Sequence, residues 1–87
     1  MLYKITVEGE YPILEEKLEK YLARKTANER IEAGVQKVTL TNGSNVEITR
    51  KGVILEMILS TTETYFNRAV RSIGRYVPAE DLSFQEI

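Results

Sequence analysis

The last helical segment of the sequence carries the side chains best suited to hold a negatively charged partner. Within "TYFNRAVRSIGRYV", residues 64–77, three arginines recur at helical spacing and no acid interrupts them. On a helix, at about 100° per residue, these arginines fall within about 60° of one another. The arginine stripe consists of Arg68, Arg71 and Arg75. Tyr65 and Tyr76 lie together on one of its borders, and arginines beside aromatic rings are what nucleic-acid binders use for phosphates and bases.

A plain solvent-exposed helix face is the alternative interpretation of the arginine stripe. Border tyrosines often pack the ring against the core and leave the hydroxyl in water. Residues 78–87, which follow directly, contain three acids and no base, and would neutralise the stripe if they folded back over it. The net charge of −1 also gives no general attraction to nucleic acids. We therefore expect no tight binding of generic DNA or RNA.

Two sets of carboxylates are candidates for acid–base or cation chemistry. Glu56 lies in the most apolar strand, where burial would raise its pKa and mark a site. The alternative is a solvent-facing Glu56, or one paired with Lys37 or Arg50. The other set lies on the first helix and would bind a hard cation or act as acid and base; its members are Glu15, Glu16 and Glu19. A solvated face with interspersed lysines explains the second set more simply.

Other catalytic chemistry lacks its usual residues. The sequence contains no histidine and no cysteine, which removes the commonest general base, the commonest transition-metal ligands and the thiol nucleophile. Its five glycines are isolated, so no phosphate-binding loop is present. We expect no enzyme, no cofactor and no metal site.

The first elements that must position these residues are a strand and a helix. Alternating apolar residues predict a half-buried strand over residues 1–9. Pro12 begins a helix whose apolar residues recur at helical spacing as far as Lys25. Beyond that point the apolar stripe loses register, and Thr26-Ala-Asn-Glu29 fits a capping box. We expect a second short helix that ends at Gly34, with one continuous helix as the alternative.

Residues 35–59 are predicted to form three strands, and the first hairpin can be placed in register. The apolar residues of the first two strands must share one face; they are Val38, Leu40, Val46 and Ile48. Because directly opposite residues in an antiparallel pair share a face, the loop must have an odd length. A three-residue loop, Thr41-Asn42-Gly43, with Gly43 in the left-handed region satisfies this condition.

The second hairpin turns at Lys51-Gly52 and is predicted to have a loop of even length. Its core face would carry Val53, Leu55, Met57 and Leu59. Ile54 and Ile58 then lie on the opposite face of the sheet, where they form a small apolar patch suited to a dimer or partner interface. The alternative is that Leu82 and Phe84 of the C-terminal segment cover this patch.

A capping box, Ser60-Thr-Thr-Glu63, is predicted to open the final helix. Its apolar stripe includes Phe66, Val70, Ile73 and Val77, and Pro78 closes it. The resulting order is β-α-β-β-β-α, which indicates an α+β fold with helices packed on one face of a mostly antiparallel sheet. We expect a single domain over residues 1–87, with residues 78–87 as an acidic C-terminal tail.

The order of these elements resembles that of double-stranded-RNA-binding domains. In those domains the second helix begins with a basic run, whereas Ser60–Glu63 contains no lysine, so no residue role is carried over. In size and in its lack of catalytic residues, the chain is similar to inhibitors and accessory proteins encoded by phages and other mobile elements.

These observations favour a non-enzymatic binding module that acts by protein–protein contact as an inhibitor, adaptor or regulatory subunit. A core of this size is marginal, so a homodimer is expected. Nucleic-acid binding through the arginine stripe is the alternative function, and a small enzyme using Glu56 or the first-helix carboxylates is a third. No apolar run is long enough to span a bilayer and no signal peptide is recognised, so we expect no membrane association and a cytoplasmic location.

Overall fold

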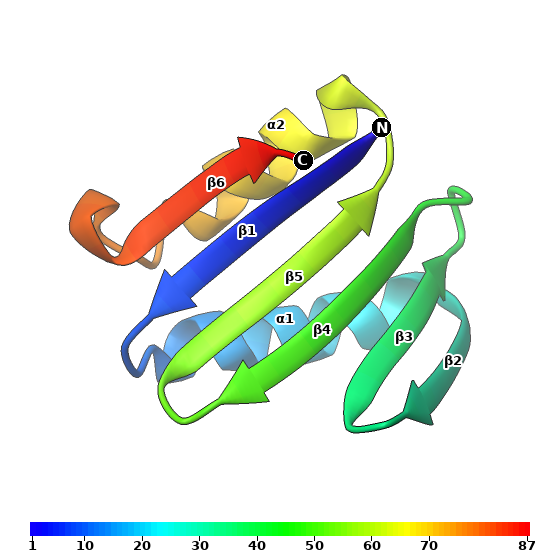
Figure 1. Ribbon diagram of the computed structural model, residues 1–87, viewed down its shortest axis with the longest axis horizontal. Helices are drawn as coiled ribbons and strands as arrows, with labels where there is room; N and C mark the ends of the chain where they lie inside the picture. Colours follow the sequence, from blue (N-terminus) through cyan, green and yellow to red (C-terminus); the bar gives the residue numbers. More distant parts are fainter.

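The fold has two layers, a six-stranded antiparallel sheet and two helices that cover one of its faces (Figure 1). The structure is a computed structural model that covers residues 1–87. The elements are β1 (Leu2–Glu8), α1 (Pro12–Lys25), β2 (Thr26–Glu32), β3 (Val35–Leu40), β4 (Asn45–Lys51), β5 (Ile54–Ser60), α2 (Glu63–Ile73), a 3₁₀ turn η1 (Ala79–Asp81) and β6 (Leu82–Glu86). The strands lie in the order β2-β3-β4-β5-β1-β6. The predicted α+β class is confirmed.

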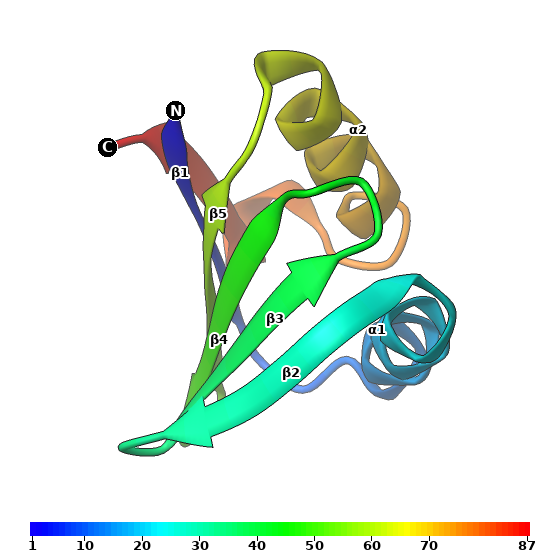
Figure 2. The same ribbon diagram turned by 90° about the vertical axis from the view of Figure 1, so that its right-hand side faces the viewer.

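The hydrophobic core lies between the sheet and the helices, which Figure 2 shows on one side of the sheet. Alternate residues of β1, β3, β4 and β5 face it, and Ile5 and Ile48 are almost completely buried at its centre. Phe66 of α2 stacks on the ring of Tyr3, with centroids 4.1 Å apart. Phe84 of β6 meets Phe66 edge-on at 6.1 Å. This aromatic group fixes α2 over β1 and β6. Neither α1 nor α2 has the length and hydrophobicity of a membrane-spanning helix.

The register predicted for the first hairpin is confirmed. Val38 lies opposite Val46 in the β3–β4 pair. The Leu40 N–H donates to the Ser44 carbonyl at 2.8 Å, so three residues form the loop. Gly43 has φ +89°, a conformation that glycine adopts without a Cβ clash. Core burial and loop length therefore select the same pairing.

The second hairpin has the even loop that was predicted, but one residue of its core face was misplaced. Lys51 pairs with Ile54, which leaves the two-residue turn Gly52-Val53. Leu55, Met57 and Leu59 are buried as expected. The expectation that Val53 faces the core was wrong, because Val53 lies in the turn and is 50% exposed.

The short helix predicted after Lys25 is wrong, since residues 26–32 form strand β2. This strand pairs antiparallel with β3, and Glu32 lies opposite Val35. Ala33 and Gly34 both have positive φ, 52° and 78°, which is the backbone of a tight two-residue hairpin turn. Gly34 therefore closes a hairpin and does not cap a helix. The ladder with β3 outweighs the weak local preference of this polar segment for a helical start.

The start of α2 also differs from the predicted capping box. Ser60 is the last residue of β5 and lies opposite both Leu2 and Asn45 in the sheet. The helix is capped instead by Thr62, whose hydroxyl accepts a hydrogen bond from the Tyr65 N–H at 3.2 Å. The helix was also predicted to run to Val77, but it ends at Ile73 and a turn follows it. Phe66 and Val77 are nonetheless buried in the core, as expected for the apolar stripe.

The C-terminal segment adds a strand to the sheet and leaves both candidate surfaces uncovered. β6 pairs with β1, with Phe84 opposite Ile5 and Leu82 opposite Val7. Because opposite residues share a face, Leu82 and Phe84 lie on the side of the helices. The alternative that they cover the apolar patch of Ile54 and Ile58 is therefore excluded.

The aromatic group gives a direct test of the packing. Phe66→Ala is expected to lower the free energy of unfolding by about 3–5 kcal/mol, because it opens a cavity beneath Tyr3. Urea denaturation followed by circular dichroism measures this change. Arg71→Ala on the exposed side of the same helix is the control and should change stability by less than about 1 kcal/mol. Equal losses for the two variants would contradict this packing of α2.

Candidate partner-binding groove

A groove of about 450 Å³ runs between α1 and α2. Fourteen of its nineteen lining residues are hydrophobic, and its floor is the core face of the sheet, including Ile5, Ile48 and Met57. These floor residues are themselves buried, so the surface open to a ligand comes from half-buried wall residues such as Leu18 and Ile73. Not one lining residue is acidic. The groove is thus apolar inside and lacks negative charge.

The α2 wall contains most of the partner-binding residues expected from the sequence. Arg68, Ser72 and Tyr65 of α2 line the groove, and Arg75 and Tyr76 line it from the turn that follows the helix. The border of the arginine stripe that carries the tyrosines therefore faces α1. Arg71 is exposed but does not line the groove, as its position on the far edge of the stripe requires.

The α1 wall supplies two further cations that the sequence alone did not indicate. Lys17 and Arg24 line the groove opposite α2. Tyr21 joins the two walls, because its hydroxyl lies 2.5 Å from the Tyr65 hydroxyl. Burial, and then this hydrogen bond, raise the pKa of Tyr65 well above its ordinary value. Tyr65 therefore stays neutral, and the charge of the groove comes from its four cations.

The cations around the groove lack ion-pair partners, which sets them apart from most others in the molecule. Lys17, Arg24, Arg68 and Arg75, together with the neighbouring Arg71, form no salt bridge. Five of the remaining seven lysines and arginines do form one. We call the four that line the groove, Lys17, Arg24, Arg68 and Arg75, the groove cations. Their positive charge is available to a ligand without breaking an existing contact.

The acidic C-terminal residues do not neutralise the groove cations. Asp81 instead accepts a hydrogen bond from the Tyr11 hydroxyl, and this contact raises the pKa of Tyr11 to about 12. Glu86 lies in β6 opposite Tyr3. Its charge contributes, after burial, to the raised pKa of that tyrosine. The acids of residues 78–87 are therefore held at the β1–β6 side of the fold.

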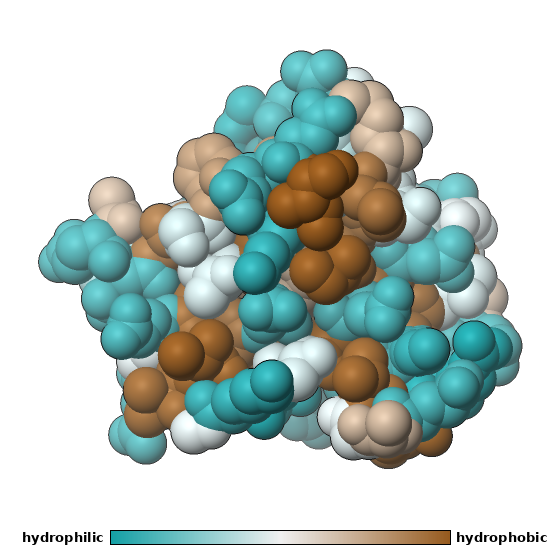
Figure 3. Space-filling view, viewed as in Figure 1, coloured by the Kyte–Doolittle hydropathy of each residue, from teal (hydrophilic) through white to brown (hydrophobic).

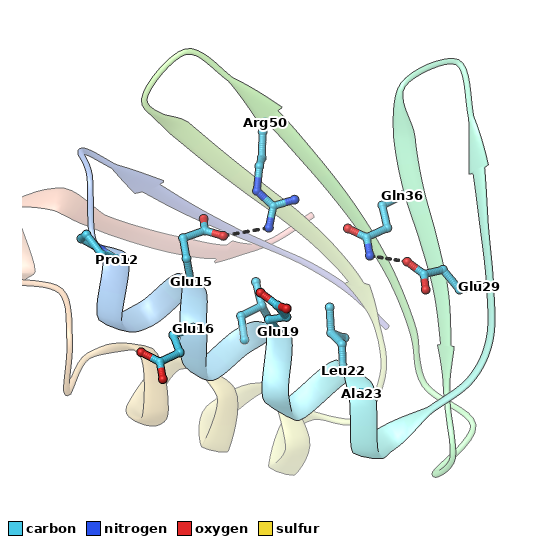
Figure 4. Close-up of a pocket in the computed structure, with 10 residues that line it drawn as sticks. Pro12, Glu15, Glu16, Glu19, Leu22, Ala23, Glu29, Gln36 and Arg50 are labelled. Carbon is cyan, nitrogen blue, oxygen red and sulfur yellow. Dashed lines mark hydrogen bonds and ion pairs between the residues drawn. The ribbon is translucent and has the colours of Figure 1, made fainter.

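A second groove of about 610 Å³ lies on the other side of α1 and has the opposite charge (Figure 4). It is bounded by α1, β2, β3 and β4, and four glutamates line it: Glu15, Glu16, Glu19 and Glu29. Arg50 donates to Glu15 at 2.9 Å, and Gln36 donates to Glu29 across the β2–β3 pair. Much of this acidic lining is thus already engaged by residues of the sheet.

The first-helix carboxylates do not assemble into a site for a cation. Glu16 points away from the sheet in Figure 4 and pairs with Lys20 at 3.0 Å. The contact with Lys20 lowers the pKa of Glu16. Glu15 is bound by Arg50, and no three acidic side chains converge as metal ligands would. The solvated-face interpretation describes these residues better than acid–base chemistry does.

Glu56 is a structural residue on the outer face of the sheet. It lies opposite Thr6 in β1 and forms an ion pair with Lys4 at 3.5 Å. Its expected partners Lys37 and Arg50 were wrong, because Lys37 pairs with Glu32 and Arg50 lies on the helix side. Glu56 lines neither of the two grooves.

The two isoleucines expected at an interface lie far from the groove, on the uncovered face of the sheet. Ile58 lies between Lys4 and Glu47 on the neighbouring strands. Leu2 is its diagonal neighbour, and the Ile87 N–H bonds to the Leu2 carbonyl at 2.9 Å. Ile54 is 40% exposed nearer the other end of β5. Figure 3 shows hydrophobic atoms on this face in separate groups, one over its upper middle and others toward its lower edge, with polar atoms between them.

Comparison with known proteins gives information on the fold alone. No protein-family model matches the chain, and no curated protein is similar to it. Among solved structures, PA4090 from Pseudomonas aeruginosa, determined by NMR, is similar over 98% of this chain and 96% of that chain, with a TM-score of 0.52 and 15% identity. At that identity the likeness supports the arrangement of helices and strands and carries no residue roles.

Proposed function

We propose that this protein is a non-enzymatic binding module that takes an acidic partner protein into the groove between α1 and α2. The observation that supports this most strongly is the set of four groove cations without ion pairs, beside an apolar groove with no acid in its lining. Arginine and tyrosine are both enriched at protein interfaces. An inhibitor, adaptor or regulatory subunit in the cytoplasm fits such a surface.

The character of the groove favours a protein partner over a nucleic acid. A protein that tracks a phosphate backbone needs charge along a polar surface, with rings open for stacking. Here the space between the cations is lined by aliphatic residues, and Tyr65 is hydrogen-bonded to Tyr21. The net charge of −1 adds no long-range attraction for a polyanion. Nucleic-acid binding remains the second candidate because all three arginines of the stripe are exposed and unpaired.

Self-association is a separate proposal and concerns the opposite side of the molecule. We assign it to the apolar patch of Ile54, Ile58, Leu2 and Ile87 on the open sheet face. Antiparallel sheets commonly leave one face in solvent, but that face is then polar. A second copy of the chain placed on this patch would leave both grooves free for partners.

The groove proposal predicts that reversing two of its charges abolishes partner capture. Arg68→Glu with Arg75→Glu places acids beside the apolar lining, so an acidic partner is repelled. We expect the immobilised wild-type chain to retain a protein from nuclease-treated lysate of its own organism. The double variant should retain less than about a tenth of that amount, a difference of about 1.4 kcal/mol or more.

The matched control is Lys25→Glu with Lys51→Glu, which changes the net charge equally at two other exposed, unpaired cations. It should capture the partner as the wild type does. Capture that disappears with nuclease treatment would favour the nucleic-acid function instead. Equal loss in both double variants would show a non-specific charge effect and remove the groove as the site.

If the chain self-associates through the open sheet face, substituting polar residues in its apolar patch should weaken self-association. Ile54→Thr with Ile58→Thr removes apolar area from the open face while keeping β-branched side chains that suit a strand. Sedimentation velocity should show the wild type as a dimer and the variant shifted toward the monomer. A monomer mass for both chains at high concentration would rule out this patch as a self-interface.

A further inference from the structure

The groove cations have a spacing that indicates the shape of the partner. On α1, Lys17 and Arg24 are seven residues apart; on the opposite wall Arg68 lies in α2 and Arg75 lies in the turn that follows it. Seven residues are two turns of a helix, a rise of about 10.5 Å. The groove therefore has two cations on each wall, and the two on α1 are separated by two helical turns.

An α-helix presents charges at this interval and an extended chain does not. Residues seven apart on a helix lie on nearly the same side, about 10.5 Å from each other. In a strand, same-side residues recur about every 6.7 Å, so neither the first nor the second repeat matches. Acids on the two borders of a partner helix would reach the cations of both walls.

The lining of the groove fits the apolar stripe of such a helix. Between the two cation pairs lie Leu18 from α1 and Ala69 and Ile73 from α2, all half-buried. These residues also pack against the main core without belonging to its fully buried part. An amphipathic helix binds a groove of this kind through apolar residues at positions i, i+3, i+4 and i+7.

We infer that the partner segment held between α1 and α2 is an amphipathic α-helix with aspartate or glutamate on both borders of its apolar stripe. This inference rests on the proposed function and makes it more specific. The acids pair with Lys17 and Arg24 on one side and with Arg68 and Arg75 on the other. The apolar stripe covers Leu18 and Ile73, as facing helices do in a coiled coil whose flanking charges select the partner.

Flanking charge gives this site its selectivity. An exposed pair contributes only about 0.2–1 kcal/mol, so no single cation determines affinity. Four pairs arranged around a buried apolar strip act together, and a basic helix in the same position meets four like charges. A helix with its acids on the outer side gains none of these pairs.

Two synthetic helical peptides of about 18 residues, five turns, test the inference. Both contain the same leucine stripe and the same composition. In the first, glutamates lie on the two borders of the stripe; in the second, they lie on the outer face and glutamines occupy the borders. Fluorescence anisotropy of labelled peptides at physiological salt measures affinity for the full chain. We expect the border-acid peptide to bind at least about tenfold more tightly.

Amide chemical shifts of the ¹⁵N-labelled chain locate the bound peptide. The largest changes should fall on Leu18, Ala69 and Ser72 and not on Thr6 or Thr49 of the open sheet face. Arg68→Glu with Arg75→Glu should remove the preference for the border-acid peptide. The control pair Lys25→Glu with Lys51→Glu should preserve it. Circular dichroism confirms that both double variants are folded.

Three results would overturn the inference. Equal affinity for the two peptides would show that the groove does not recognise acids on the borders of the apolar stripe. Shifts confined to the open sheet face would place the site elsewhere. Tighter binding of a mixed-sequence single-stranded DNA than of either peptide would assign the groove cations to phosphates. If the natural partner is lost from the groove variant while the peptides bind equally, the proposed function stands and the helix inference fails.

Discussion

The structure depends on how one apolar face of a six-stranded sheet is buried. Only two helices are available to cover it, and both lie on the same side (Figures 1 and 2). Phe66 fixes α2 above Tyr3, while α1 buries Leu14 and is joined to α2 through the Tyr21–Tyr65 hydroxyl contact. The helices cover the core without closing over the middle, and the groove is the space they leave.

Helix α1 gives the two sides of this arrangement opposite charge. Toward the sheet it presents glutamates, and Glu15 is neutralised by Arg50. Toward α2 it presents Lys17 and Arg24, which form no salt bridge. Internal pairing stabilises the first side a little and leaves the second free for a partner. The same helix thus completes the fold and forms one wall of the proposed site.

The sequence predicts the secondary structure correctly where burial imposes an apolar pattern, and it does not do so where the chain is polar. The Thr41-Asn42-Gly43 loop followed from the need to bury both strands on one face. Strand β2 was missed because its polar residues carry no strong alternation and its pairing with β3 is a tertiary effect. The tyrosine border of the arginine stripe was found, whereas its orientation toward Lys17 and Arg24 depends on the position of α1. Those two cations share a seven-residue spacing with Arg68 and Arg75 that the sequence already contains.

The central claim is that the groove between the helices is where this protein meets its partner. Site-specific photocrosslinking in the organism that encodes the chain tests it most directly, with benzoylphenylalanine at Ser72 in the groove or at Thr49 on the open sheet face. We predict that Ser72 crosslinks one protein, at a segment whose acids flank an apolar helical stripe. Thr49 should crosslink only a second copy of this chain. Crosslinks of a different protein from Thr49 and none from Ser72 would contradict the account.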